Sequence, residues 1–304
     1  MHRLAPIFIV LAAILWGIDG IVLRPSLYSL PVTLVVFVES AIVAIYLSPI
    51  LFKNSKELKS LKTADWLAFA GVALFGGAIG TMAITKALFY VNFVNLSIVI
   101  LIQKLQPVFA LILAAVILRE RLSKKFFFWA ALAIIGAYFM TFGARLPVFD
   151  AGDKTFAAAA FSLLAAFSFA FSTILSKRAL QNVSFELGTY LRFFITTIIM
   201  MTIVLSLGKF SAVNSINSKQ IIVFLIIAFT TGGPAIFIYY YGLKRTAASV
   251  STIAELAFPL TAVILEYLLR KNILDFIQWI GVVVLVFSIL KVTRLNIKKE
   301  SNTS

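Results

Sequence analysis

The chain has no cysteine, and its single histidine, His2, lies at the N-terminus. The lack of cysteine excludes disulfide bonds and thiolate chemistry. Without cysteine, a second histidine or acids paired at ligand spacing, the sequence also offers no ligand set for a metal ion. Intramembrane hydrolases and acyltransferases usually need such groups. We therefore expect no enzymatic activity, no metal and no cofactor.

Charged residues are scarce as well. Of the 304 residues, 13% are charged and 62% are hydrophobic, whereas about a quarter of the residues in a soluble domain are charged. Apolar runs of about 20 residues recur along the chain, and each is long enough to cross a bilayer as a helix. The sequence therefore predicts an all-α polytopic membrane protein that is embedded in the lipid bilayer.

The distribution of the charged residues indicates the membrane topology of the chain rather than nucleic-acid binding. The net charge is +15, but most Lys and Arg residues lie between the apolar runs or at their ends. Connections on the N-terminal side hold more than twice as many of them as connections on the opposite side. This bias places both termini in the cytoplasm, and we expect the protein in the cell (inner) membrane. The ten predicted spans are 4–23, 31–52, 64–90, 96–118, 124–143, 155–175, 186–207, 219–241, 247–269 and 273–292.

The two halves of the chain align with an offset near 153 residues. QPVFALIL (106–113) falls on FPLTAVIL (258–265), which places Pro107 on Pro259. Each half holds five predicted spans, and because five is odd the second copy must be inserted upside down. The sequence thus predicts ten transmembrane helices as two inverted five-helix repeats. Their predicted bounds are 1–145 and 154–293, followed by a polar cytoplasmic tail at 294–304.

The segments LIQKLQPVFALILAAVILRERL (101–122) and ELAFPLTAVILEYLL (255–269) resemble the drug/metabolite transporter superfamily, and more narrowly its tandem EamA-type ten-helix permeases. The second half departs from the pattern, because Asn272 stands where the first half has Glu120. The resemblance implies a secondary transporter that exports small polar metabolites such as amino acids by alternating access. Drug export and an organic-anion or nucleotide-sugar carrier are the alternatives, and an intramembrane enzyme is a remote one. The oligomeric state, monomer or homodimer, stays open.

Polar residues beside two prolines mark the expected substrate site. Pro107 removes the hydrogen bond to the carbonyl of Gln103, and Pro259 removes the one to Glu255. In lipid, a freed carbonyl must find another partner or line a cavity. Lys104 and Glu255 lie near the bilayer midplane by residue count. We predict that they face one aqueous cavity and hold the two ends of a zwitterion; a structural ion pair is the alternative.

Two aromatic features complete the predicted binding site. Trp16 lies in the middle of its span beside Gly17, away from the interfacial belt, so it is a candidate cavity wall. Its partner in the repeat alignment is Phe169. The run 239–241 consists of three tyrosines near the cytoplasmic end of their span. Belt anchoring is the default interpretation of that run, but Tyr239 could gate the cavity.

Acidic residues inside the spans are candidates for proton coupling, which makes protons a possible partner. Glu255 and Glu39 lie deepest, and a bridge from Glu39 to its repeat partner Arg192 is possible. Asp19 is a further candidate, although its place toward the outer end favours a solvated side chain. Arg24 follows it and is assigned to the outer connection as a topology charge.

Overall fold

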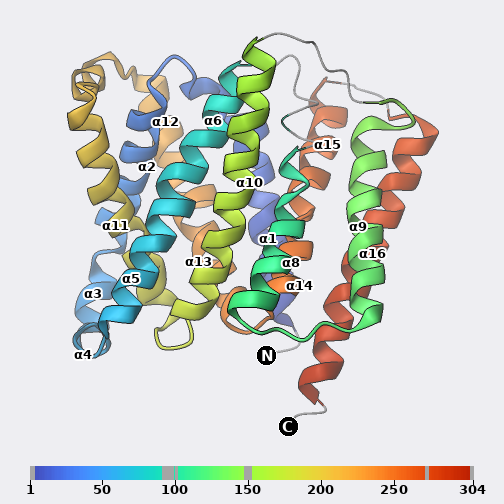
Figure 1. Ribbon diagram of the computed structural model, residues 1–304. Helices are drawn as coiled ribbons and strands as arrows, with labels where there is room; N and C mark the ends of the chain where they lie inside the picture. The colour runs from blue at the N-terminus through green and yellow to red at the C-terminus, as the bar shows by residue number, and fades with distance from the viewer. Residues whose placement is uncertain (1–3, 91–98, 100–101, 147–152, 271–273, 302–304) are drawn as a thin grey trace.

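The computed structural model describes residues 4–90, 99, 102–146, 153–270 and 274–301. Within these ranges every regular element is a helix, and most of the helices run side by side in one bundle (Figure 1). The first half contains α1 (Ala5–Ile18), η2 (Asp19–Leu23), η3 (Arg24–Leu27), α2 (Val32–Leu47), α3 (Pro49–Lys53), α4 (Ser55–Lys59), α5 (Thr63–Val72), η4 (Ala73–Ile79), α6 (Gly80–Tyr90), α8 (Gln106–Ile117) and α9 (Lys124–Phe142).

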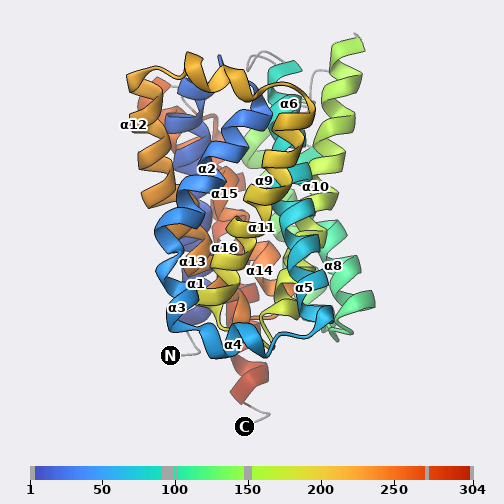
Figure 2. The same cartoon turned by 90° about the vertical axis from the view of Figure 1, so that its left-hand side faces the viewer.

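The second half repeats this all-helical pattern. It contains α10 (Asp153–Ala179), α11 (Phe185–Ser206), η5 (Phe210–Ser215), α12 (Ser218–Ile227), η6 (Ala228–Gly232), α13 (Gly233–Lys244), α14 (Ala248–Ala254), α15 (Ala257–Arg270) and α16 (Phe276–Ser301). The described parts of α1 and α16 put both chain ends at the same end of the bundle (Figure 1). Figure 2 shows α4 crossing that same end. Which side of the membrane this end faces stays a prediction.

Eight helical stretches among the described residues are long and apolar enough to cross a membrane. The predicted second and fourth spans correspond to shorter apolar helices, Val32–Leu47 and Gln106–Ile117. Both are shortened by proline, because Pro49 opens α3 and Pro107 stands at the start of α8, where its missing N–H costs nothing. Most of the fourth span's predicted beginning, 96–102, lies outside the described residues. The chain is thus a polytopic helical protein, while the number ten and the inverted repeat stay predictions.

Helices of the two halves interleave. α1 packs on α13, α2 on α11, α6 on α10 and α9 on α16. The α9–α16 contact is close because glycines face each other's backbone: a Cβ on Gly281 would lie 2.7 Å from the carbonyl carbon of Phe139, and one on Gly136 would lie 2.8 Å from the Leu285 nitrogen. Because helices of the two halves pack on one another, residues of both halves line the space between them.

Two helices widen at matching places in the predicted repeat. The glycine-rich segments of the third and eighth spans form π-helical turns, η4 and η6, and such turns occur frequently at functional sites. In η4, a Cβ on Gly77 would lie 2.7 Å from Cγ2 of Thr196, so only glycine permits this approach of α11. Both turns contribute residues to the cavity described next.

Candidate functional site

A cavity of about 410 Å³ lies between the halves of the bundle, within the range of small-molecule sites. Both halves supply polar or aromatic side chains to it, so the bundle brings together residues that are distant in sequence. From the first half these include Trp16, Glu39 and Lys104, and from the second half Arg192, Tyr239 and Glu255. Gln103, Pro107 and Pro259 also line it.

The two predicted helix interruptions are present. The chain turns at Leu105 before α8 begins, and it leaves helical geometry between α14 and α15 at Glu255 and Leu256. Of the two outcomes predicted for the carbonyl of Glu255, another partner rather than the cavity is observed, because the backbone N–H of Phe258 donates to it at 2.9 Å. The N–H of the residue before Pro259 thus bonds the carbonyl three residues back, in place of the bond from four residues on that proline cannot make. The side chain of Glu255, rather than its carbonyl, is therefore the polar group offered to the cavity.

Glu255 is held by donors from two other segments. The Tyr239 hydroxyl donates to Oε1 at 2.7 Å, and Nε2 of Gln106 donates to Oε2 at 2.9 Å. The Tyr239 hydroxyl also pairs with the hydroxyl of Thr173 at 3.1 Å. Tyr239 is 3% exposed and Tyr240 is fully buried. The default assignment of these two tyrosines to an interfacial belt is therefore wrong, because α13 turns them inward.

Trp16 lies on the cavity wall, at the place predicted for it. Its ring is tilted against Tyr239, with the ring centroids 5.2 Å apart. The repeat partner Phe169 lines the same cavity. Aromatic faces at this spacing provide a large apolar surface with a definite geometry. The site thus combines an aromatic wall with a buried carboxylate.

Lys104 is buried, with 5% of its surface exposed, and its ammonium has no hydrogen-bond partner among the described residues. The alternative prediction of a structural Lys104–Glu255 ion pair is wrong, because the ion pairs among those residues both involve Arg24. The neighbouring Gln103 donates instead to the backbone carbonyl of Ser162 at 2.9 Å. Lys104 is thus a buried cation in the cavity wall whose ammonium has unused hydrogen-bonding capacity.

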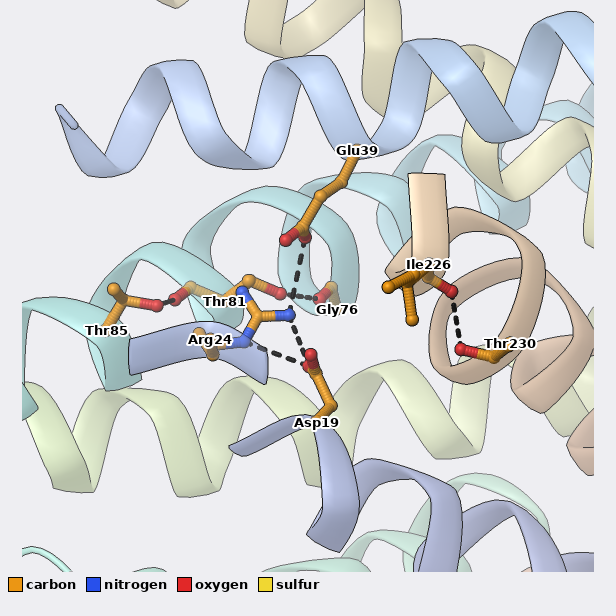
Figure 3. A network of polar contacts seen from close by, with 8 residues as sticks. All are labelled: Asp19, Arg24, Glu39, Gly76, Thr81, Thr85, Ile226 and Thr230. Carbon is orange, nitrogen blue, oxygen red and sulfur yellow. Dashed lines mark hydrogen bonds and ion pairs between the residues drawn. The ribbon is translucent and has the colours of Figure 1, made fainter. Parts of the chain in front are cut away.

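Figure 3 shows a second cluster, formed by Asp19, Arg24 and Glu39. Arg24 donates to Oδ2 of Asp19 from Nε at 3.0 Å and from Nη2 at 2.6 Å. Its Nη2 also lies 3.4 Å from Oε2 of Glu39. Beside the cluster, Thr81 and Thr85 of α6 donate their hydroxyls to backbone carbonyls of their own helical segment.

This cluster corrects three expectations from the sequence. Asp19 is 7% exposed rather than solvated. Arg24 is not a charge in an outer connection, since its side chain is only 17% exposed and lines the cavity. Glu39 pairs with Arg24 rather than with Arg192, whose Nη1 donates to the Tyr240 hydroxyl at 3.3 Å. The cause is local: the chain continues as the π-turn η2 and the tight turn η3, which fold Arg24 back over Asp19.

Carboxylates also join the two halves at the end of the bundle where the chain begins. Glu57 of α4 accepts hydrogen bonds from the backbone N–H and the hydroxyl of Ser184, the residue that caps α11. Burial would raise the pKa of Glu57, but these bonds and one from Asn54 hold that pKa below its ordinary value. Glu120 accepts from the backbone N–H groups of Ala248 and Ser249 at 2.8 and 3.2 Å. These contacts tie the two halves together at that end of the bundle.

A helical membrane bundle with a central cavity lined by both halves is an arrangement that membrane transporters use. The EamA-like transporter family matches the sequence twice, over residues 3–142 and 156–294. The chain belongs to the EamA-like transporter family. This confirms the resemblance to tandem EamA-type permeases of the drug/metabolite transporter superfamily.

Individual relatives agree with this assignment. The chain is 42% identical over 296 residues to the "Riboflavin transporter ImpX" of Fusobacterium nucleatum subsp. nucleatum, covering 97% of this chain and 99% of that protein. It is 27% identical over 241 residues to the "Uncharacterized transporter sll1164" of a Synechocystis species, covering 76% of this chain and 66% of that one. A crystal structure of a protein with 16% identity superimposes with a TM-score of 0.75 over 98% of both chains, a likeness of fold.

Proposed function

We propose that the protein is a secondary transporter of riboflavin that works by alternating access between two inverted five-helix repeats. The carrying observation is the 42% identity, over nearly the whole of both chains, to a protein named as a riboflavin transporter. This proposal takes the place of the amino-acid substrate expected from the sequence. Amino acids and organic anions become competitors in the test, and the expected export direction is left to the measurement.

The chemistry of the cavity supports a cargo of this kind. Riboflavin joins a planar, neutral three-ring system to a chain of hydroxyl groups. Trp16 and Tyr239 offer aromatic faces for stacking, an interaction worth about 0.5–1.5 kcal/mol for an aromatic pair beyond its buried area. Lys104 and Glu255 offer a donor and an acceptor beside that wall. Apolar walls with few polar groups are typical of small-molecule sites.

The charges lining the cavity favour a neutral cargo over a phosphorylated one. Its basic residues are Arg24, Lys104 and Arg192, and its acidic residues are Asp19, Glu39 and Glu255. Recognition of a phosphate normally uses clustered cations free of acidic neighbours, whereas Arg24 is already paired with two carboxylates. We therefore expect riboflavin to be preferred over its 5′-phosphate, which carries the same rings.

Liposomes containing the purified full chain provide the test. Riboflavin flux is followed in both directions by its own fluorescence, with riboflavin 5′-phosphate, ribitol and amino acids as competitors. We expect riboflavin flux that saturates as the riboflavin concentration rises and that amino acids leave unchanged. Amino-acid flux without riboflavin flux would restore the prediction made from the sequence and refute this proposal.

A matched pair of tryptophan variants tests the assignment of the cavity wall. Trp16→Leu removes the ring that contacts Tyr239, so riboflavin affinity should fall by roughly twofold to thirteenfold, the equivalent of about 0.5–1.5 kcal/mol. Trp279→Leu changes a residue that is 46% exposed on α16 and should leave affinity within twofold. Equal effects of the two substitutions would remove Trp16 from the binding site.

A further inference from the structure

The cluster of Asp19, Arg24 and Glu39 brings one cation and two carboxylates together in the buried region between the helices. Each carboxylate keeps one buried oxygen without a partner among the described residues, Oδ1 of Asp19 and Oε1 of Glu39, and Nη1 of Arg24 is likewise unpartnered. All three residues line the cavity. With both acids ionised, the cluster has two negative charges and one positive charge. Burying the unbalanced negative charge at low dielectric costs free energy.

The two carboxylates are bound unequally. Asp19 receives two contacts from Arg24, at 3.0 and 2.6 Å, both shorter than the usual upper limit of about 3.2 Å. Glu39 receives one contact at 3.4 Å, beyond the usual upper limit of about 3.2 Å. A proton placed on Asp19 would disrupt the main partner of Arg24. A proton placed on Glu39 would leave that pair intact and remove the surplus negative charge.

The other charged groups near the cavity are engaged elsewhere or stand apart. From α11, Arg192 donates to Tyr240, and from the α14–α15 break, Glu255 is held by Tyr239 and Gln106.

From α6, Thr81 and Thr85 face the cluster as neutral groups (Figure 3), while the Lys86 ammonium lies 5.1 Å from the Phe161 ring centre. Lys104, just before α8, lines the same cavity but forms no ion pair among the described residues. Arg24 is thus the cation that contacts Glu39 directly.

We propose that this cluster is the binding site for a coupling proton, with Glu39 as the group that takes it up and Asp19 as the fixed counter-ion of Arg24. The inference rests on the proposed transport function and identifies a proton gradient as its driving force. Protonated Glu39 becomes a hydrogen-bond donor facing the cavity, and Arg24 keeps its free Nη1. Both then offer donors to the carbonyl-rich edge of a flavin ring. Proton and substrate therefore bind cooperatively and move in the same direction.

The test compares driven accumulation with exchange in liposomes containing the full chain and riboflavin, with the membrane potential clamped. In the wild type, an acidic exterior should cause several-fold accumulation of riboflavin that a protonophore abolishes, and exchange at equal pH should vary with pH. In Glu39→Gln the driven accumulation should disappear, and the remaining exchange should no longer depend on pH. In Asp19→Asn both accumulation and exchange should fall, because Arg24 loses its fixed partner.

Asp275→Asn is the control, since Asp275 is exposed just before α16 and lies outside the cavity; this variant should accumulate riboflavin as the wild type does. Accumulation by Glu39→Gln at the wild-type level would overturn the inference. So would a wild type that exchanges riboflavin without responding to a pH gradient, and that result would leave the proposed function standing. Accumulation driven by a gradient of the opposite sign would refute cooperative binding.

A second measurement does not depend on the substrate. Infrared difference spectra of the purified protein after a drop in pH report the C=O stretch of newly protonated carboxyl groups. We expect a band in the wild type that is absent from Glu39→Gln and present in Asp275→Asn. If the wild type failed to exchange riboflavin, the proposed function would fail, and this band would still decide whether Glu39 binds the proton. Its persistence in Glu39→Gln would exclude Glu39.

Discussion

Tyr239→Phe removes one oxygen atom from the lining of the cavity and leaves the ring in place. The lost hydroxyl donates to Glu255 at 2.7 Å and pairs with Thr173 at 3.1 Å. The phenylalanine ring still fills the space against Trp16, so the change creates no large cavity. Glu255 keeps its bond from Gln106. The effect therefore isolates the hydrogen bonds of a single hydroxyl group.

The expected size follows from those contacts. A hydrogen bond to a charged group contributes about 1.5–3 kcal/mol to stability, and a bond between neutral groups about 1 kcal/mol. With Glu255 ionised, the loss of the Tyr239 hydroxyl should lower the free energy of unfolding by about 1.5–3 kcal/mol. That corresponds to a roughly 10- to 100-fold change in the unfolding equilibrium.

Reversible unfolding in mixed micelles measures this free energy for Tyr239→Phe, Glu255→Gln and the double variant. The double-mutant cycle should show a coupling energy of at least about 0.5 kcal/mol, because the two side chains are in direct contact. Tyr241→Phe is the matched control, since Tyr241 acts through its ring, which lies 3.8 Å from the guanidinium carbon of Arg245. A Tyr239→Phe variant as stable as this control would refute the assigned geometry.

Two further predictions concern the packing of the helices and the carboxylate contact between Glu57 and Ser184. Gly281→Ala places a Cβ 2.7 Å from the carbonyl carbon of Phe139. It should destabilise the α9–α16 pair by about 1–3 kcal/mol in the same unfolding assay, whereas Gly20→Ala, with its nearest contact at 3.9 Å, should not. Hydrogen bonds hold the pKa of Glu57 below its ordinary value. Its contribution to stability is therefore complete above about pH 4.3 and is lost as the pH falls through the lowered value. Unfolding measured across this acidic range should show a smaller pH dependence in Glu57→Gln, and an unaltered dependence would contradict the assignment.

Local sequence signals were sufficient for part of the site. Pro107 and Pro259 each act on the helix that contains them, so the two interruptions could be located without a structure. The depth of Lys104 and Glu255 followed from the helical rise, and both line the one cavity. What those residues contact was not local. Tyr239 and Gln106 approach Glu255 from two other parts of the chain, and no pattern in the sequence specifies that approach.

Arg24 shows where such reasoning fails. A basic residue at the end of an apolar run normally marks the end of the membrane span, and Pro25 directly follows it. The π-turn η2 and the tight turn η3 instead carry Arg24 back toward Asp19, five residues earlier. The sequence signal for this contact is an acidic and a basic residue five positions apart, with a proline directly after the basic one. It is weak, because an i, i+5 pair does not share one face of a regular α-helix.

The two halves place comparable positions around the cavity but give them different chemistry. At the offset of the predicted repeat, Asp19 corresponds to Ser172 and Glu39 corresponds to Arg192, and all four residues line the cavity. The acid pair therefore belongs to the first half alone, and the matching positions of the second half carry a hydroxyl and a cation. A rocking carrier needs its halves to be equivalent in shape, but a single coupling proton needs only one acceptor. This difference between the halves is what a carrier with one proton site requires.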